Sequence, residues 1–345
     1  MNELLLNQPS AFTTLIKTFS LQLIMNRYLV NLRYAFNPNK PILFLRLASK
    51  YLQKFLTKET TVSYVDLQIG KRCNIRCPHC FVNEYTDDGD DRVSPEEYSK
   101  VVKEAMGMGA VIFSFQGGEP LMYPDLKEYV KVAHPEANII SIKTNGTMIT
   151  KEKCKELKQM GVDILTVSVD KFRPMEYKVI LDRVKLAQKE GMKVTISSVV
   201  THENLRSEFI QEMIDFAEQN KIILMLILAA PSGKWEGVDS LMLNQEDLKF
   251  LQNIIDTYTY VRTDMDSIYT KHECPAGREI IYIKSDGNTG GCPFVPIEHG
   301  NVKDTNIGEI RHRIINDSLF KREVCVAGNG EFRCHPAYLA AQKAK

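Results

Sequence analysis

Six short stretches of the chain alternate apolar and polar residues or are continuously apolar, and a stretch with helical spacing follows each of the first five. The strand-like stretches are residues 64–69, 110–115, 138–143, 163–169, 193–200 and 222–228. The helical stretches begin after Ser94 and then lie near residues 124–133, 151–160, 175–190 and 207–219. Strands separated by helices predict a parallel sheet with right-handed crossovers. We therefore expect an α/β fold that curls into a partial (β/α)6 barrel of the TIM type.

Residues 1–60 have a different character and predict a helical N-terminal extension. They carry eight basic residues against two acidic ones, a net charge of +6. Apolar residues recur at helical spacing, residues 37–41 break the pattern, and a second helix is expected from about residue 42 to 56. Two interpretations remain open. The extension packs on the main domain, or it presents a basic amphipathic surface to a membrane or an anionic substrate.

The chain after the sixth strand predicts two further segments. Residues 231–270 read as a helical connector, with an amphipathic helix from about 244 to 258. Residues 271–345 begin with a β-hairpin around Asp286-Gly287, followed by a helix near 307–315. The predicted organisation is an extension over 1–60, a core over 61–230, a connector over 231–270 and a small C-terminal domain over 271–345.

Composition narrows the class of protein. The chain is 44% hydrophobic and 25% charged with a net charge of +1, so no strong field favours nucleic acid. The longest apolar run, residues 222–230, is too short to cross a bilayer. The N-terminus lacks the pattern of a secretory signal, which predicts a cytoplasmic protein with reduced cysteines. Clusters among its eight cysteines then indicate metal ligands rather than disulfides.

Polar segments follow the predicted strands, and the first of them carries three cysteines. Cys73, Cys77 and Cys80 come after the first strand. Residues 116–120, 144–147, 168–170 and 201–204 come at or after the next four. Because parallel strands end at one rim, these segments are expected to meet there. Three thiolates are one short of the four that close an iron–sulfur cube, which leaves one iron open. Zinc held with His79 as a fourth ligand is the alternative.

The CxxxCxxC spacing on a loop after the first strand of a β/α series resembles the radical S-adenosylmethionine (SAM) superfamily. The resemblance implies a [4Fe–4S] cluster held by the three cysteines, with SAM bound to the open iron and an electron donor such as flavodoxin or ferredoxin. Residues 117–120 resemble the family's Gly-Gly-Glu-Pro segment. The implied SAM-binding residues are Gly117, Gly118, Glu119 at the methionine ammonium, Asn145, Ser168, Asp170 and, near the adenine, His79. No proton-transfer residue is assigned, and Lys143 is expected to have an ordinary surface role.

Four other cysteines form a complete ligand set near the C-terminus. Cys274, Cys292, Cys325 and Cys334, with a hairpin after the first of them, resemble the SPASM/Twitch extension of radical SAM enzymes. The shorter Twitch form implies one auxiliary [4Fe–4S] or [2Fe–2S] cluster. The separation of Cys325 and Cys334 departs from the family pattern, so His335 is a possible substitute ligand and structural zinc is an alternative. Cys154 is interpreted as a packed side chain.

The resemblance implies an enzyme that cleaves SAM to a 5′-deoxyadenosyl radical and abstracts a hydrogen from its substrate. The auxiliary cluster would accept an electron afterwards. A small sugar-like or alcohol substrate, oxidised or epimerised, is the leading hypothesis, because no leader-peptide domain is evident. Maturation of a peptide or protein is the alternative within the class. A zinc-stapled binding protein is the alternative outside it.

Overall fold

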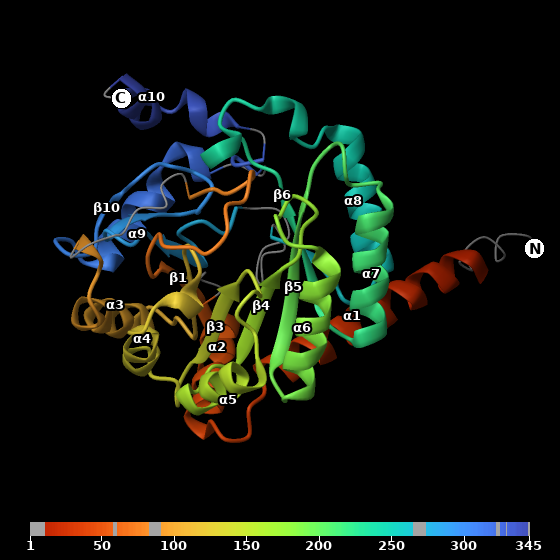
Figure 1. The fold of residues 1–345 in the computed structure, drawn as a ribbon, viewed down its shortest axis with the longest axis horizontal. Helices are drawn as coiled ribbons and strands as arrows, with labels where there is room; N and C mark the ends of the chain where they lie inside the picture. The colour runs from red at the N-terminus through yellow and green to blue at the C-terminus, as the bar shows by residue number, and fades with distance from the viewer. Residues whose placement is uncertain are drawn as a thin grey trace, which may run out of the picture.

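The fold is built on one ten-stranded sheet with the order β10-β9-β8-β1-β2-β3-β4-β5-β6-β7 (Figure 1). The computed structural model describes residues 11–57, 61–82, 91–264, 274–321, 325–328 and 330–343. Neighbouring strands from β8 through β1 to β7 pair in parallel, whereas β9 pairs antiparallel with both β8 and β10. The two edge strands β10 and β7 do not pair with each other, so the sheet is open, as expected for a partial barrel.

The strands have the following bounds: β1 Tyr64–Gln68, β2 Ile112–Gln116, β3 Ile139–Thr144, β4 Ile164–Ser168, β5 Lys193–Val200, β6 Ile223–Leu228, β7 Val261–Thr263, β8 Ile280–Ile283, β9 Asn288–Gly290 and β10 Gly300–Asn301. The α-helices are α1 Ala11–Ala35, α2 Pro41–Thr57, α3 Pro95–Gly107, α4 Leu126–Val132, α5 Lys151–Met160, α6 Tyr177–Lys189, α7 Glu208–Asn220, α8 Gln245–Thr257, α9 Ile307–Asn316 and α10 Pro336–Lys343. The six predicted strands are confirmed, each to within two residues at either end.

The C-terminal hairpin belongs to the same sheet as the core. Strand β8 pairs in parallel with β1, with Tyr64 opposite Ile280 and Leu67 opposite Ile283. Strand β9 then turns back antiparallel to β8. The predicted hairpin is therefore present, and it extends the barrel wall next to the strand that leads into the cysteine loop. Strand β7, only three residues long, extends the opposite edge.

The two faces of the strands differ in chemistry. Alternate residues such as Leu67, Phe115 and Ile142 are fully buried in one continuous apolar core that includes residues of α3 to α8. Their neighbours on the other face, such as Asp66, Gln116 and Ser141, are polar. Since side chains alternate across a strand, the polar set shares the concave face. The interior of the partial barrel is therefore polar rather than a packed apolar core.

Helices α1 and α2 close the end of the barrel where the strands begin. Lys40 reaches the carbonyls of Asn138 and Gly161 at 3.1 Å and the carboxylate of Asp163 at 2.5 Å. Lys50 donates to the carbonyls of residues 62 and 109 at 2.6 and 2.7 Å. These acceptors directly precede strands or end the helices before them. The extension is thus packed on the main domain through its basic side chains.

Candidate active site

The cysteine loop is fixed to the end of β2 by backbone contacts. Gly118 N donates to Gly70 O at 2.9 Å, and Glu119 N donates to Arg72 O at 2.8 Å. A Cβ at Gly118 would lie 1.9 Å from Arg72 O, and one at Gly117, where φ is +142°, would lie 2.3 Å from Gly70 O. Only glycine permits this approach. The two glycines therefore hold the segment that leads into Cys73 against the end of β2.

The Glu119 carboxylate joins the ends of β2 and β3. It is completely buried and accepts hydrogen bonds from Leu121 N at 3.1 Å, Thr144 Oγ1 at 2.8 Å and Asn145 N at 2.7 Å. Burial raises the pKa of Glu119 above its usual value, while these donors oppose the shift. Glu119 therefore fixes the backbone at Asn145, in addition to the ligand contact that the resemblance implies.

Asn145 lies directly beside the first cysteine. Its Nδ2 is 3.8 Å from Cys73 Sγ and donates to Asn74 Oδ1 at 2.9 Å. Its Oδ1 accepts from Thr147 N at 2.9 Å, which fixes the amide orientation. The ends of β1 and β3 thus meet at Cys73, as the position of the polar segments predicts.

Asp170 and Arg173, after β4, form a charged pair beside the second cysteine. Arg173 Nε is 3.0 Å from Asp170 Oδ2, and Arg173 Nη1 is 3.8 Å from Cys77 Sγ. His79 Nε2 lies 3.5 Å from the same carboxylate, and Val199 N donates to Oδ1 at 2.6 Å. Burial would raise the pKa of Asp170, but the interactions with His79 and Arg173 outweigh burial and lower it to about 2. Sequence reasoning missed Arg173, although it is three residues from Asp170.

His79 lies in an aromatic enclosure above this pair. Its ring centroid is 5.5 Å from that of Phe172 and 5.6 Å from that of Trp235. The Nδ1 atom is buried and has no hydrogen-bond partner among the described residues. Buried polar atoms are normally satisfied, so this nitrogen marks a position where a bound molecule would supply a partner. Ser168 lies at the end of β4, with its Oγ 3.4 Å from Ser197 Oγ.

The three thiols gather in a way that fits an iron–sulfur cluster. Cys77 interacts electrostatically with both Cys73 and Cys80, and burial raises its pKa to about 11. Among the described residues, no three His, Cys, Asp or Glu side chains are placed to bind a single metal ion. The donor set fits the cluster, and the Arg173 guanidinium offsets the charge of the Cys77 thiolate.

The concave face contributes a charged pair that sequence reasoning did not assign to the site. Lys143 Nζ and Gln116 Nε2 both lie 2.6 Å from Asp66 Oδ2. Burial would lower the pKa of Lys143, but the Asp66 carboxylate raises it above its usual value. Lys143 is therefore a positively charged group on the inner wall rather than an ordinary surface residue.

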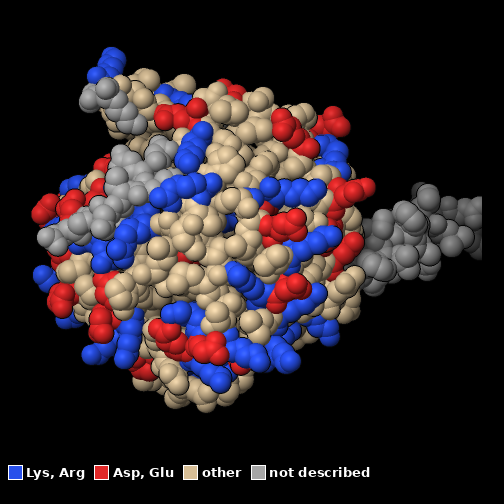
Figure 2. Space-filling model, in the orientation of Figure 1, with Lys and Arg blue, Asp and Glu red and all other residues tan. Residues whose placement is uncertain are grey.

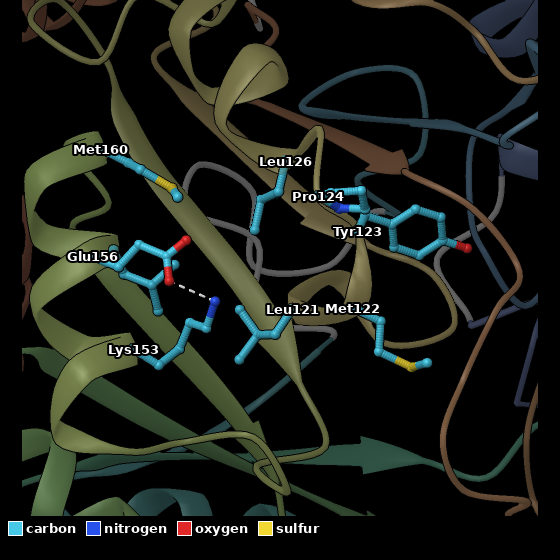
Figure 3. A pocket seen from close by; sticks show the side chains of 9 residues that line it. Leu121, Met122, Tyr123, Pro124, Leu126, Lys153, Glu156 and Met160 are labelled. Atoms are coloured by element: carbon cyan, nitrogen blue, oxygen red, sulfur yellow. Dashed lines mark hydrogen bonds and ion pairs between the residues drawn. The ribbon is translucent and has the colours of Figure 1, made fainter.

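Two hollows differ in their relation to the site. One, of about 440 Å³, lies along residues 171–178 and includes Arg173, so it adjoins the cysteine loop. The other, of about 110 Å³, lies between α5 and the segment before α4, where Lys153 and Glu156 pair at 2.5 Å (Figure 3). None of its lining residues is a cysteine.

Charges of both signs are scattered over the face shown in Figure 2, in keeping with the low net charge.

Three of the four C-terminal cysteines gather at a second centre. Cys292 interacts electrostatically with Cys274 and Cys325, and all three pack against a second apolar cluster that includes Ile314 and Phe332. Burial raises the pKa of Cys325 to about 12 and also raises those of the other two. The fourth cysteine, Cys334, is exposed, and His335 Nε2 lies 3.4 Å from Asp317. Cys154 is buried in the main core, where a packed side chain is expected.

The two cysteine centres face each other across a short aromatic bridge. Phe81, next to Cys80, and Phe294, two residues after Cys292, meet edge-on with centroids 5.5 Å apart. Buried Tyr282 interacts electrostatically with both Cys80 and Cys292, and its hydroxyl donates to Gln68 Oε1 at 3.0 Å. Because β8 pairs with β1, the second centre is held beside the first.

The sequence between β1 and α7 matches a known family. Residues 67–217 match the Radical SAM superfamily. This segment is a radical SAM domain. Its cofactors are a [4Fe–4S] cluster and SAM, and solved structures of the same fold are described with bound S-adenosylmethionine.

Curated relatives of the radical SAM domain include the Fe-coproporphyrin III synthase of Methanosarcina barkeri, which is 31% identical over 51% of this chain and 45% of its own length. The AdoMet-dependent heme synthase of Oleidesulfovibrio alaskensis is 21% identical over 70% of this chain and 72% of its own. Streptococcus suis SuiB bound to precursor peptide SuiA has the same fold, with a TM-score of 0.61 and 16% identity over 79% of this chain and 69% of SuiB. The chain spans about half the length of the first curated relatives it matches.

The charged pair predicts a pH-dependent contribution of Asp170 to stability. A carboxyl whose folded pKa of about 2 lies below its unfolded value stabilises the protein above pH 4 and loses this effect as pH falls through about 2. The difference corresponds to about 2 kcal/mol at pH 7 and roughly half of that at pH 3. We expect the free energy of unfolding, measured with urea, to differ between the native chain and Asp170→Asn, and this difference to be smaller at pH 3 than at pH 7. A difference that stays constant between pH 7 and pH 3 would contradict this.

Proposed function

We propose that this protein is a radical SAM enzyme with an auxiliary iron–sulfur cluster. The observation that carries the proposal is the arrangement of three thiols at the end of β1 beside Asn145 and Arg173, with a second group of thiols held next to them. When bound, the first cluster supplies the electron that cleaves SAM into methionine and a 5′-deoxyadenosyl radical, which removes a hydrogen atom from the substrate. The residues of the chain bind, orient and enclose the reactants.

Each rim segment has a specific task in this proposal. Cys73, Cys77 and Cys80 would hold the cluster through three of its irons and leave the remaining iron for SAM. Arg173 balances the thiolate charge at Cys77, and Asp170 holds Arg173 in place. The unsatisfied Nδ1 of His79, within its aromatic enclosure, offers a hydrogen bond to a flat polar ring such as adenine.

The concave wall favours a small, polar substrate that is sugar-like or carries an alcohol. Asp66, Lys143 and Gln116 present a charged and hydrogen-bonding surface there. Hydroxyl groups could exchange hydrogen bonds with these side chains, whereas an apolar substrate would leave them desolvated and unpaired. Oxidation at a carbon bearing a hydroxyl would require an electron acceptor, which a cluster at the second centre, beside Phe81 and Phe294, would supply. Epimerisation at that carbon would instead require a hydrogen donor. A peptide substrate is the competing case.

The test is an anaerobic assay of the reduced protein with SAM, in which 5′-deoxyadenosine and the mass of the product are measured. Sugars, aminocyclitols and synthetic peptides serve as candidate substrates. Formation of 5′-deoxyadenosine that is stimulated by a polyol, with a product two mass units lighter, supports oxidation of an alcohol. Stimulation by a peptide alone favours peptide modification. A colourless protein with stoichiometric zinc and no SAM cleavage would favour the binding-protein alternative.

We also propose that the N-terminal helices α1 and α2 contact the surface of a lipid bilayer. Several basic side chains of α1 and α2 face the barrel, so the outward face is apolar. The exposed residues there include Met25, Tyr28, Leu29, Leu32, Phe36, Phe44, Leu45 and Tyr51. No acidic residue occurs between positions 4 and 58. Within the described residues, no helix is long and apolar enough to span a membrane. An apolar face without acidic residues, with Arg33 exposed on the same helix, suits the surface of a bilayer that contains anionic lipids.

Lipid contact predicts that removing apolar side chains from α1 weakens binding to vesicles. Leu29 and Leu32 are 61% and 62% exposed. We expect Leu29→Ser combined with Leu32→Ser to lower partitioning into phosphatidylglycerol vesicles about tenfold or more, because two apolar contacts are lost. Val179→Ser, which changes an exposed valine on α6, serves as the control and should bind as the native chain does. Absence of vesicle binding together with a dimer in sedimentation equilibrium would replace lipid with a second copy as the occupant.

A further inference from the structure

The segment after β6 lies directly against the backbone of the third cysteine of the β1 loop. Lys234 N donates a hydrogen bond to Cys80 O at 3.0 Å. A Cβ at Gly233, where φ is +63°, would lie 2.5 Å from Cys80 O and 2.4 Å from Phe81 Cα. Only glycine fits against these backbone atoms. The position of the cysteine loop therefore depends on where this segment lies.

Trp235, in the same segment, forms one wall of the aromatic enclosure of His79. Its ring centroid lies 5.6 Å from that of His79 and 5.4 Å from that of Phe172. The backbone here forms a single 3-10 turn, η3 Gly233–Trp235, without a side-chain cap at its start. The hydrogen bonds of such short turns have poor geometry. Contacts from other parts of the chain must therefore help to hold the indole in place.

The C-terminal helix α10 binds the side chain of Glu236, which directly follows η3. Tyr338 Oη donates a hydrogen bond to Glu236 Oε1, and Gln342 Nε2 donates to the same oxygen at 2.6 Å. The two donors are four residues apart, so they lie on one face of α10. Arg333, just before α10, pairs with Asp239 at 2.8 Å. The last helix and the turn before it thus hold the segment after β6 at two carboxylates.

Tyr338 also connects this contact to the second cysteine centre. Its ring meets that of Phe332 edge-on, with the centroids 5.4 Å apart. Both rings are buried in the second apolar cluster, against which the three gathered cysteines pack. Because close-packed interiors transmit displacements, a shift in that cluster would reach Glu236 through Tyr338. The contact therefore lies between the two centres of the protein.

We propose that Tyr338 and Gln342 are positioning residues, which act through Glu236 to keep the enclosure of the SAM site closed. The inference rests on the proposed function insofar as this enclosure receives the adenine of SAM. While α10 holds Glu236, the indole of Trp235 stays against the imidazole of His79, whose buried Nδ1 has no hydrogen-bond partner among the described residues. Release of Glu236 would free η3 and let water reach the imidazole, so a flat ring would bind there more weakly. Helix α10 thus sets the affinity for SAM from outside the site.

The test uses the fact that Trp235 is the only tryptophan of the chain. Tyr338→Phe combined with Gln342→Met removes both donors to Glu236 but keeps a ring beside Phe332. The full-length protein and this variant are purified anaerobically with their iron. We expect the variant to keep its iron content, to show indole emission at longer wavelength, and to bind SAM about tenfold more weakly in equilibrium dialysis, because a carboxylate loses two hydrogen bonds.

Two further variants separate positioning from a general loss of stability. Leu339→Gln changes an exposed residue of the same helix and is the matched control, which should alter neither the emission nor the Kd for SAM. Glu236→Ala alone should reproduce both changes. Adding the two α10 substitutions to Glu236→Ala should change nothing more, because all three remove the same interaction. Urea unfolding reports the fold of each protein, and should the α10 variant unfold, Glu236→Ala decides by the same two measurements.

The outcomes distinguish this inference from the proposed function. Unchanged emission and unchanged SAM affinity in Glu236→Ala would overturn the inference, and so would additive effects of the substitutions on the two sides of the contact. If the native chain forms 5′-deoxyadenosine but its SAM affinity does not depend on Glu236, only the inference fails. If SAM affinity and indole emission depend on Glu236 but the native chain does not cleave SAM, only the proposed function fails.

Discussion

Replacement of Cys73, Cys77 and Cys80 by alanine should abolish formation of 5′-deoxyadenosine. The three sulfurs are the proposed cluster ligands on the loop after β1, and the cysteine that follows on α5, Cys154, lies buried in the apolar core where it cannot substitute. In the proposed function the electron for SAM comes from the first cluster, which these three thiols would hold. We therefore expect the activity to fall below detection rather than by a fixed factor. Iron content should fall from about eight to about four per chain if both centres hold cubes.

Cys154→Ala is the matched control for the triple variant, because it also removes a thiol but outside the site. Burial of Cys154 in the core predicts a modest loss of stability and unchanged iron content. Anaerobic purification, iron analysis and quantification of 5′-deoxyadenosine under strong reductant provide the measurements. SAM cleavage that survives in the triple variant would remove the basis of the proposed function.

Sequence periodicity predicted the core of the fold because its strands are long enough to show a pattern. Residues 193–200 alternate over eight positions and became β5 without a shift. Strand β7, by contrast, has three residues, Val261–Thr263, which is too few for a period to emerge. Helical spacing also predicted that α1 and α2 are helices that carry both apolar and basic side chains. It could not tell which side faces the barrel, since that depends on the carbonyls exposed near the strand starts.

In the candidate site, too, residues that follow a local sequence pattern were predictable, and residues brought together only by the fold were not. Cysteine spacing predicted Cys73, Cys77 and Cys80 as ligands, because metal ligands on one loop must follow one another closely. Arg173 lies 3.8 Å from Cys77 Sγ in space, and no local pattern connects it to a cysteine. Its position beside Cys77 depends on the course of the chain after β4, which the sequence pattern does not give. The glycines before Glu119 were expected to approach a ligand, and the structure adds a close approach to the chain's own backbone.

That close approach makes Gly118→Ala the second substitution with a large expected effect. The added Cβ would lie 1.9 Å from Arg72 O, 2.4 Å from Arg72 C and 2.6 Å from Lys71 O. All three atoms belong to the backbone, so no side-chain rotation relieves the overlap. The two segments must separate, which breaks the hydrogen bonds from Gly118 N to Gly70 O and from Glu119 N to Arg72 O. We expect a loss of about 3 kcal/mol or more in the free energy of unfolding.

The same separation would move the loop that carries the cysteines, so Gly118→Ala should also lose the iron of the first centre. Gly107→Ala is the control, since nothing lies within 4 Å of a Cβ at the end of α3 and its φ is not positive. That variant should be unchanged or more stable by about 0.5–1 kcal/mol, because alanine favours a helix. Urea unfolding and iron analysis compare the two alanines. Equal midpoints and equal iron in both variants would mean that the Gly70–Arg72 segment can move freely, and the anchoring role of this glycine would have to be abandoned.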